Sequence, residues 1–377
     1  MALTAPANTA PLSTDYPTRI RSVSPSETAT TIGAAVGSLC LVWLLYEEIL
    51  PFSGAVGFWI SWYVMFLILY AAMAAMQWDR RDAVNRLSAV SFGTGGALAI
   101  AIVVATASYS LFKGLGAVSH LSFITQTMQY AGPSSPLSQG GVLHAMVGSL
   151  EQLGLATCIS VPLGIAAALF LAEVGGPLAK PVRTIVEAMT ALPDLIAGMF
   201  IYSLFILSLG FSQSGFMAAL AISVNMIPIV ARASEVVIRL VPGSLREASY
   251  ALGASQWRTV VNVVLPTARA GLATAVVLAM ARGIGETAPV LFTAGFTKVL
   301  NLNPFSGPQL NLPLYIWNYV RVEGEVAADF TRGFGAAFVL VILVLILFTI
   351  ARVLGGSTPG QLSKRQQRRL TKEAQLS

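Results

Sequence analysis

An arginine and a glutamate stand one helical turn apart inside a long apolar stretch. Arg282 lies about eleven residues into the predicted span 270–294. A rise of about 1.5 Å per residue places it roughly 16 Å from the start of that span. An ionisable side chain at this depth costs about 2.5–3.5 kcal/mol in a membrane and usually has a function. Glu286 follows on the same helix face and is positioned to hold the guanidinium. Because guanidinium groups bind oxyanions through paired N–H donors, the pattern predicts an anion site.

The residues around this pair would open the backbone to a ligand. Gly283 and Gly285 lack side chains, so an anion could approach the main chain there. Pro289 cannot donate a helix hydrogen bond and should kink the helix. Asp194 reaches a similar depth in another span and could pair with Arg282. Two interpretations stay open at this point, namely an anion pathway and a purely structural ion pair.

The apolar stretches that carry these residues define the fold class. Hydrophobic residues make up 55% of the 377 residues, charged residues make up 11%, and the mean hydropathy is +0.72. Soluble domains carry about 25% charged residues, so these values exclude a soluble globular protein. The apolar runs are continuous and about 20 residues long, which is typical of membrane-spanning helices and not of alternating strands. We therefore predict an all-α transmembrane helical bundle of about eight spans, at about 31–46, 55–76, 89–112, 145–173, 184–210, 215–234, 270–294 and 333–353.

The chain divides into four predicted parts. Residues 1–28 read as a disordered tail, 29–87 as a transmembrane hairpin with a charged linker, 88–353 as a six-span core and 354–377 as a basic tail. Most Lys and Arg residues lie in segments that are cytoplasmic if both termini are inside, which predicts that orientation. Basic residues at span ends and in the tail indicate contact with membrane lipid. Since no folded part is basic, nucleic acid is not expected as a partner.

The segment 235–269 departs from the pattern of the spans. Ser244 and Glu247 have the spacing of a capping box, and Gly253 has the position of a helix-ending residue. We therefore predict a short helix at Leu245–Leu252, lying across the cytoplasmic face. It could fill a groove on a partner protein and transmit a rigid-body movement, or it could rest on lipid headgroups.

This loop resembles part of a known family. Glu247-Ala248-Ser249, Gly253 and Leu265-Pro266 are similar to the "EAA…G…LP" loop of ABC-importer permeases, with Ser249 in place of the second alanine. In that family the loop forms a coupling helix that sits on the ATPase subunit. The resemblance therefore implies a coupling helix at 244–253, with ATPase-coupling residues Arg246, Glu247, Ala248, Leu252 and Gly253.

A second stretch of residues resembles one particular subunit within that family. Residues 281–294 resemble the A-type permease subunit of phosphate-specific ABC importers, and Asn303-Pro304-Phe305 and Leu312–Trp317 agree with that assignment. The resemblance covers about residues 88–353, so it implies an ABC-importer permease domain there. It also implies half of a phosphate translocation pathway. The candidate residues for this pathway are those singled out above by depth and chemistry, Asp194, Arg282, Gly283, Gly285 and Glu286, together with Thr287 of the resembling stretch.

The resemblance implies partner proteins and no cofactor in this chain. The sequence contains no G-x-x-x-x-G-K-[S/T] phosphate loop. ATP, with its Mg²⁺, would therefore be hydrolysed on another polypeptide, and this chain would not be an enzyme. The implied partners are an ATPase homodimer, a second permease subunit and an extracytoplasmic phosphate-binding protein, at the plasma membrane of a prokaryote. Cys40 and Cys158 lie in apolar runs and predict neither a disulfide nor a metal site.

Two alternatives stay open. The coupling loop alone would also fit a permease for another oxyanion, sulfate or molybdate. From a different class, the chain could be an ion-coupled secondary transporter that needs no ATPase. The well-bounded loop helix and the lack of an obvious inverted repeat in the sequence argue against that class.

Overall fold

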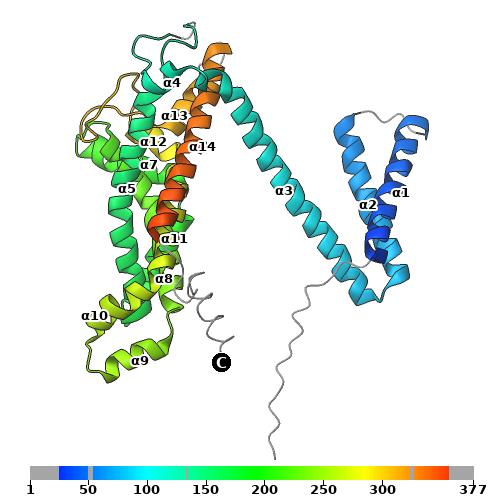
Figure 1. Cartoon of the computed structure of the whole chain (residues 1–377), viewed down its shortest axis with the longest axis horizontal. Coiled ribbons are helices and arrows are strands. Elements are labelled where there is room, and N and C mark those ends of the chain that lie inside the picture. The colour runs from blue at the N-terminus through cyan, green and yellow to red at the C-terminus, as the bar shows by residue number, and fades with distance from the viewer. Residues whose placement is uncertain (1–24, 50–53, 133–134, 323–326, 356–377) are drawn as a thin grey trace, which may run out of the picture. The chain divides into compact units, whose positions relative to one another are not determined.

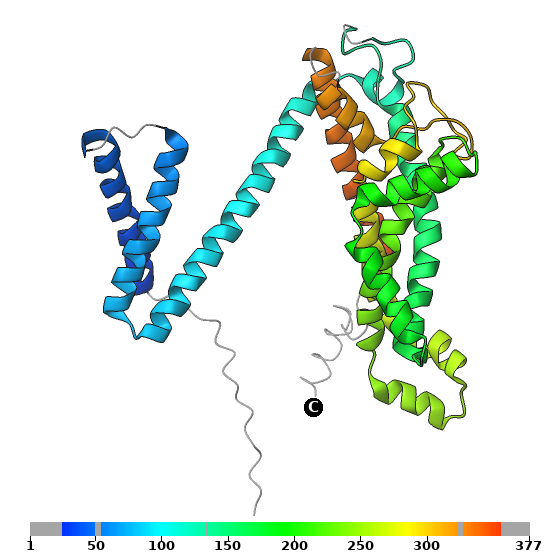
Figure 2. The same cartoon turned by 180° about the vertical axis from the view of Figure 1, so that it is seen from behind.

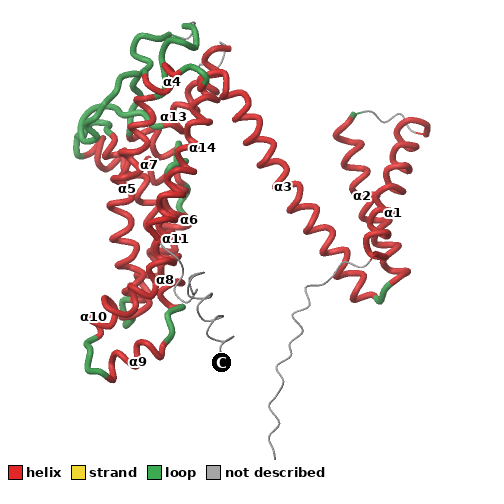
Figure 3. Tube along the Cα trace, viewed as in Figure 1, coloured by secondary structure: helices red, strands yellow, loops and turns green. Residues whose placement is uncertain are grey.

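The computed structural model describes residues 25–49, 54–132, 135–322 and 327–355. Across these ranges the regular structure is helical, with no strand (Figure 3). Seven helices are long and apolar enough to cross a membrane, and an eighth span results if one bent helix pair counts as a single span. The prediction of an all-α bundle with about eight spans is therefore confirmed. The chain forms two compact units, Met1–Ala105 and Thr106–Ser377, and each is described by itself.

The helices carry the labels of Figure 1. Their bounds are α1 Pro25–Leu44, α2 Ala55–Gln77, α3 Arg80–Val118, α4 Leu121–Thr125, α5 Leu143–Leu169, α6 Ala179–Ala191, α7 Asp194–Ile201, α8 Gly215–Arg239, α9 Gly243–Ala251, α10 Gln256–Thr259, α11 Leu265–Gly283, α12 Ala288–Thr293, α13 Leu312–Trp317 and α14 Ala327–Gly355. Short π-helical stretches follow several of them, at Leu45–Ile49, Phe170–Val174, Tyr202–Ser208, Val260–Val264 and Asn318–Val322.

The first unit is a helical hairpin followed by the start of a long helix. α2 packs back along α1 through the buried rings of Phe66 and Tyr70. The first turns of α3 are joined to α1 by an ion pair of 2.9 Å between Arg86 and Glu27. These contacts hold the three segments together as one small bundle.

The core of the second unit is built around α8. This helix packs against α5 and α11 and is the most buried of the candidate spans. Ile222, Met226 and Val230 supply much of its buried apolar surface. Gly164 of α5 lies directly against Val230, so a side chain at that glycine would collide with α8. Small residues of this kind let transmembrane helices approach closely.

The spans predicted at 184–210 and 270–294 are each broken in the structure. α6 and α7 meet at an angle of 104°. The break falls at Pro193, which disfavours helical backbone at the preceding residue, and that residue is extended. In the other span, α11 ends at Gly283 and a separate helix, α12, starts only at Ala288. The predicted spans 184–210 and 270–294 therefore each contain two helices, whereas the sequence indicated a kink only at Pro289 in the second.

The loops of the second unit gather at its two ends. α9 and α10 lie at one end, in the loop between α8 and α11, whereas α4 and α13 lie at the opposite end (Figures 1 and 2). The segment that the sequence singled out as a possible coupling loop therefore stands at one end of the helical core.

Candidate functional site

Arg282 forms a triad of charges with two carboxylates. Its Nη2 lies 2.5 Å from Oδ2 of Asp194, and its Nε lies 3.2 Å from Oε1 of Glu286. The side chain of Arg282 is 53% exposed and that of Asp194 is 32% exposed, whereas Glu286 is 7% exposed. The sequence raised both pairings as possibilities, and the structure combines them in one cluster at the surface of this chain.

The triad lies where the two broken spans meet. Asp194 is the first residue of α7, where the positive end of the helix dipole stabilises a carboxylate. Arg282 lies in the last turn of α11, and Glu286 follows in the segment before α12. Pro289 stands in the first turn of α12, where its missing N–H costs no helix hydrogen bond. The sequence placed a kink at Pro289, but α11 already ends at Gly283 and this proline lies in the first turn of the next helix.

Two glycines let the broken helices pack closely. Gly198 of α7 lies against the main chain of Pro289 in α12, so a Cβ at Gly198 would collide with backbone atoms. Gly283 is buried, and a Cβ there would lie 2.7 Å from the sulfur of Met226 in α8. Gly283 therefore serves helix packing and is not open to a solute, contrary to the expectation from the sequence. Gly285 is exposed and has room around it.

The triad combines one positive and two negative charges. With both carboxylates in place the triad would repel an oxyanion. An oxyanion would reach the half-exposed guanidinium of Arg282 only by replacing the carboxylate of Asp194, which is the more exposed of the two. Glu286 is buried and can hold the guanidinium in place during such an exchange. A guanidinium has five N–H donors and can bind an oxyanion through two of them at once. Thr287 is half-buried beside the triad, and its side chain caps no helix N–H group.

A buried polar network, which the sequence did not reveal, joins α5 to the triad. Gln152 donates to the carbonyl oxygen of Gln309 at 2.8 Å, and Asn311 donates to the carbonyl oxygen of Glu286 at 3.3 Å. Gln152, Gln309 and Asn311 are all buried. The available signal was Gln152, a large polar residue in the apolar span predicted at 145–173. The network ties the non-helical segment of Glu286 to the loop before α13.

The start of α9 differs from the prediction, and its end agrees with it. The helix begins at Gly243 after Pro242, so Ser244 lies inside the first turn and no side chain caps the helix. The predicted capping box of Ser244 and Glu247 is therefore wrong. Gly253 has a φ of +78°, and its N–H and that of the next residue donate back into α9 at 2.9 and 3.2 Å. These are the paired bonds of a glycine-ended helix. A Cβ at Gly253 would meet no atom of this chain within 4 Å, so glycine is needed here for its backbone conformation.

Arg246 anchors α9 to the helical core. Its guanidinium binds both carboxylate oxygens of Glu173 after α5, the shortest contact being 2.7 Å. It also donates to the carbonyl oxygens of Val241 and Ile238 at 2.6 and 2.8 Å. Arg246 is only 19% exposed and Glu173 6% exposed. Arg246 therefore faces this chain, whereas the sequence placed it among the residues that contact a partner.

Large apolar side chains stand exposed on the loop formed by α9 and α10. Leu252 is 89% exposed and Trp257 is 72% exposed, and Leu245 is also exposed. Glu247 and Ala248 are also exposed, on α9. Clustered apolar residues at a surface mark contacts with a protein or a membrane. The loop is thus held to the core through Arg246, and it exposes apolar side chains of its own.

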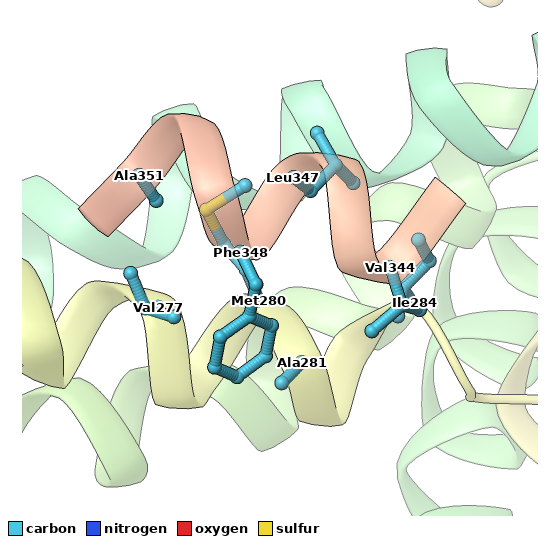
Figure 4. Close-up of a pocket in the computed structure, with 8 residues that line it drawn as sticks. All are labelled: Val277, Met280, Ala281, Ile284, Val344, Leu347, Phe348 and Ala351. Atoms are coloured by element: carbon cyan, nitrogen blue, oxygen red, sulfur yellow. The ribbon is translucent and has the colours of Figure 1, made fainter. Parts of the chain in front are cut away.

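A narrow apolar pocket between α11 and α14 lies near the triad in sequence but has different chemistry (Figure 4). Its volume of about 10 Å³ is at the lower limit for a single water molecule. It offers no polar group to an anion, because it is lined by Val277, Met280, Ala281, Ile284, Val344, Leu347, Phe348 and Ala351. In the part of the chain that the structure describes, no group of three or more His, Cys, Asp or Glu residues could hold a metal ion.

Comparison with known proteins gives one family match and several similar proteins. Residues 160–356 match the family described as "Binding-protein-dependent transport system inner membrane component". The phosphate transport system permease protein PstA of Mycobacterium leprae is 39% identical over 266 residues, which cover 70% of this chain and 86% of that protein. The PstA protein of Haemophilus influenzae is 37% identical over 239 residues, covering 63% of this chain and 82% of that protein. A solved structure of the MetNI methionine ABC transporter, in an inward-facing conformation, is 20% identical with a TM-score of 0.43, covering 57% of this chain and 90% of that chain.

Proposed function

Because the chain belongs to the family of binding-protein-dependent transport system inner membrane components, we propose that it is the permease subunit of an ATP-driven phosphate importer. The observation that carries this proposal is its identity of 39%, over 86% of the relative's length, to a protein named as a phosphate transport system permease. The half-exposed guanidinium of Arg282 supports it, because this group has the charge and the donors that an oxyanion needs.

In the proposed pathway, phosphate exchanges with Asp194 at the guanidinium of Arg282. When no anion is present, the carboxylate of Asp194 pairs with the guanidinium of Arg282. Arg282 is then not left as an unpaired positive charge within the membrane. Glu286 holds the Nε side of the guanidinium throughout. Since both Asp194 and Glu286 lie at helix breaks, movement of α7 relative to α11 would change the distance between Arg282 and its competing carboxylate. Alternating access would then alter the affinity for phosphate.

The loop of α9 and α10 is the proposed contact with the ATPase. Its exposed apolar side chains would lie in a groove of the ATPase subunit, and Arg246 would transmit the movement to α8 and to the end of α5. This end of the core would then be cytoplasmic, as the distribution of Lys and Arg predicts. We propose an ATPase homodimer, a second permease subunit and an extracytoplasmic phosphate-binding protein as the remaining components.

Uptake into proteoliposomes tests this function. The complex of this chain, its ATPase and the second permease subunit is reconstituted with the binding protein outside and ATP inside. We expect ATP-dependent uptake of phosphate that excess sulfate or molybdate does not inhibit. Uptake of sulfate or molybdate in place of phosphate would contradict the substrate. Uptake driven by an ion gradient in vesicles without the ATPase would contradict the whole proposal and favour a secondary transporter.

A further inference from the structure

A second cluster of charges lies between α6 and α8. Arg183 and Glu187 of α6 and Arg232, Glu235 and Arg239 of α8 surround a cavity of about 420 Å³. This volume falls within the range of small-molecule sites. Arg239 is the last residue of α8, so the cavity lies at the end of the core from which the α9–α10 loop leaves. None of these residues belongs to the triad around Arg282.

The charges of the cavity are not balanced. Three guanidinium groups face two carboxylates, which leaves one net positive charge. Glu235 is shared between Arg183 at 2.7 Å and Arg239 at 2.9 Å. Arg232 lies 3.6 Å from Glu187, which is beyond hydrogen-bond distance, and both of these side chains are about half exposed. Arg232 is therefore the least committed cation of the cluster.

The arginines also retain hydrogen-bond donors. Each guanidinium carries five N–H groups. Arg183 donates to Glu235, and Arg239 donates to Glu235 and to the carbonyl oxygen of Leu171. Glu235 and Leu171 thus hold Arg239 at one wall of the cavity. Arg183 uses one N–H group on Glu235 and Arg232 lies beyond hydrogen-bond distance of Glu187, so their remaining N–H groups are available to a ligand between α6 and α8. Two planar cations at one cavity are suited to a ligand with several negative oxygens.

We propose that this cavity binds a phosphate group, with Arg183 and Arg232 as its donors. The group can belong to free inorganic phosphate or to the headgroup of an anionic phospholipid, since both present negative oxygens around one phosphorus atom. The inference depends on the charges of the cavity and not on the solute that the complex imports. It is therefore tested by binding in the absence of transport.

The test uses the assembled complex in nanodiscs of phosphatidylcholine, without ATP and without the binding protein. The probe is radioactive inorganic phosphate in equilibrium dialysis. Arg183→Gln/Arg232→Gln should weaken binding at least about tenfold, which corresponds to about 1.4 kcal/mol. The matched control Arg269→Gln/Arg321→Gln removes the same charge from exposed positions outside the cavity and outside the α9–α10 loop, and it should bind as the unchanged complex does. Phosphate held at Arg282 is unaffected by either change, so the difference reports the cavity.

A variant with the opposite effect separates binding from loss of folding. Glu187→Gln raises the net charge of the cavity by one and should strengthen phosphate binding, which an unfolded protein would not do. The second probe is phosphatidylglycerol, supplied in nanodiscs and detected by native mass spectrometry. If a lipid headgroup is the occupant, the unchanged complex should retain this lipid and the Arg183→Gln/Arg232→Gln complex should lose it. Loss of either probe with this double variant but not with the control supports the proposal and identifies the source. Equal binding of both probes by all of these complexes would overturn it.

Discussion

Replacing Arg246 with alanine should uncouple ATP hydrolysis from transport while the chain stays in the membrane. The guanidinium of Arg246 connects α9 to Glu173 and to the carbonyl oxygens of Val241 and Ile238. Alanine removes all of these bonds at once and leaves the carboxylate of Glu173 almost fully buried without this partner. The α9 helix would then move independently of α8, and a push from the ATPase would not reach the core.

The size of the effect follows from the burial of this pair. Removing one partner of a buried ion pair costs about 3–5 kcal/mol, and the partial exposure of Arg246 places the cost near the lower value. A loss of about 3 kcal/mol raises the population of the detached loop by roughly a hundredfold, since each 1.4 kcal/mol is a factor of ten. Hydrogen exchange of the α9 amides should accelerate by up to that factor.

The assay combines two measurements on the reconstituted complex. Hydrogen–deuterium exchange reports the attachment of α9, and the ratio of phosphate taken up to ATP hydrolysed reports coupling. Arg269→Ala is the control, because Arg269 lies exposed on α11, outside the α9–α10 loop. Wild-type exchange in α9 together with a wild-type ratio in the Arg246→Ala complex would refute the role of this anchor.

Three further substitutions test the end of α9, the contact between α7 and α12, and a buried ion pair of α14. Gly253→Val should destabilise the end of α9 by about 1–2 kcal/mol because of the positive φ, and it should lower the phosphate taken up per ATP hydrolysed. Gly253→Asn should retain most of this uptake per ATP, and an equal ratio in the two variants would contradict the conformational role of Gly253. Gly198→Val should push α7 away from the main chain of α12, at a cost in stability of about 1–3 kcal/mol, and should reduce phosphate uptake. Gly154 has open space around it, so Gly154→Val should not reduce uptake. Equal uptake by the two variants would contradict the close contact of Gly198. Arg332→Met breaks a fully buried pair with Asp329 at about 3–5 kcal/mol, so the Tm of the complex should fall, and an unchanged Tm would show that the pair does not stabilise it.

The parts of the fold that depend on local sequence were predictable. The length and continuity of the apolar runs indicated the spans because a bilayer imposes one length on every helix that crosses it. Gly253 was predicted as the end of α9 because a left-handed residue is a local requirement. The resemblance of Glu247–Gly253 to ABC-importer permeases is confirmed by the family match over residues 160–356. The narrower resemblance of residues 281–294 is confirmed by the PstA relative that is 39% identical over 70% of this chain.

The parts that depend on tertiary contacts were not predictable. The break before α12 accompanies the close contact of Gly198 with Pro289, and nothing in the spacing of these residues shows that they meet. Gly283 was interpreted as access to the backbone, but only its burial against α8 shows that it packs helices. The start of α9 was misplaced because the carbonyl oxygen of Pro242 already accepts the N–H of Leu245. Ser244 is thereby drawn into the first turn.

The measurement that tests the central claim most directly is ATP-dependent phosphate uptake by complexes altered at Arg282. Arg282→Gln should assemble normally and lower uptake by at least about a hundredfold, because charge-assisted hydrogen bonds contribute about 1.5–3 kcal/mol each. Arg282→Lys should retain part of the uptake, since it keeps the charge but lacks the planar pair of donors. Asp194→Asn/Arg282→Gln removes both members of the ion pair and should remain inactive if Arg282 binds the anion. Normal phosphate uptake by this double variant would show that Arg282 only balances Asp194, and would contradict the account.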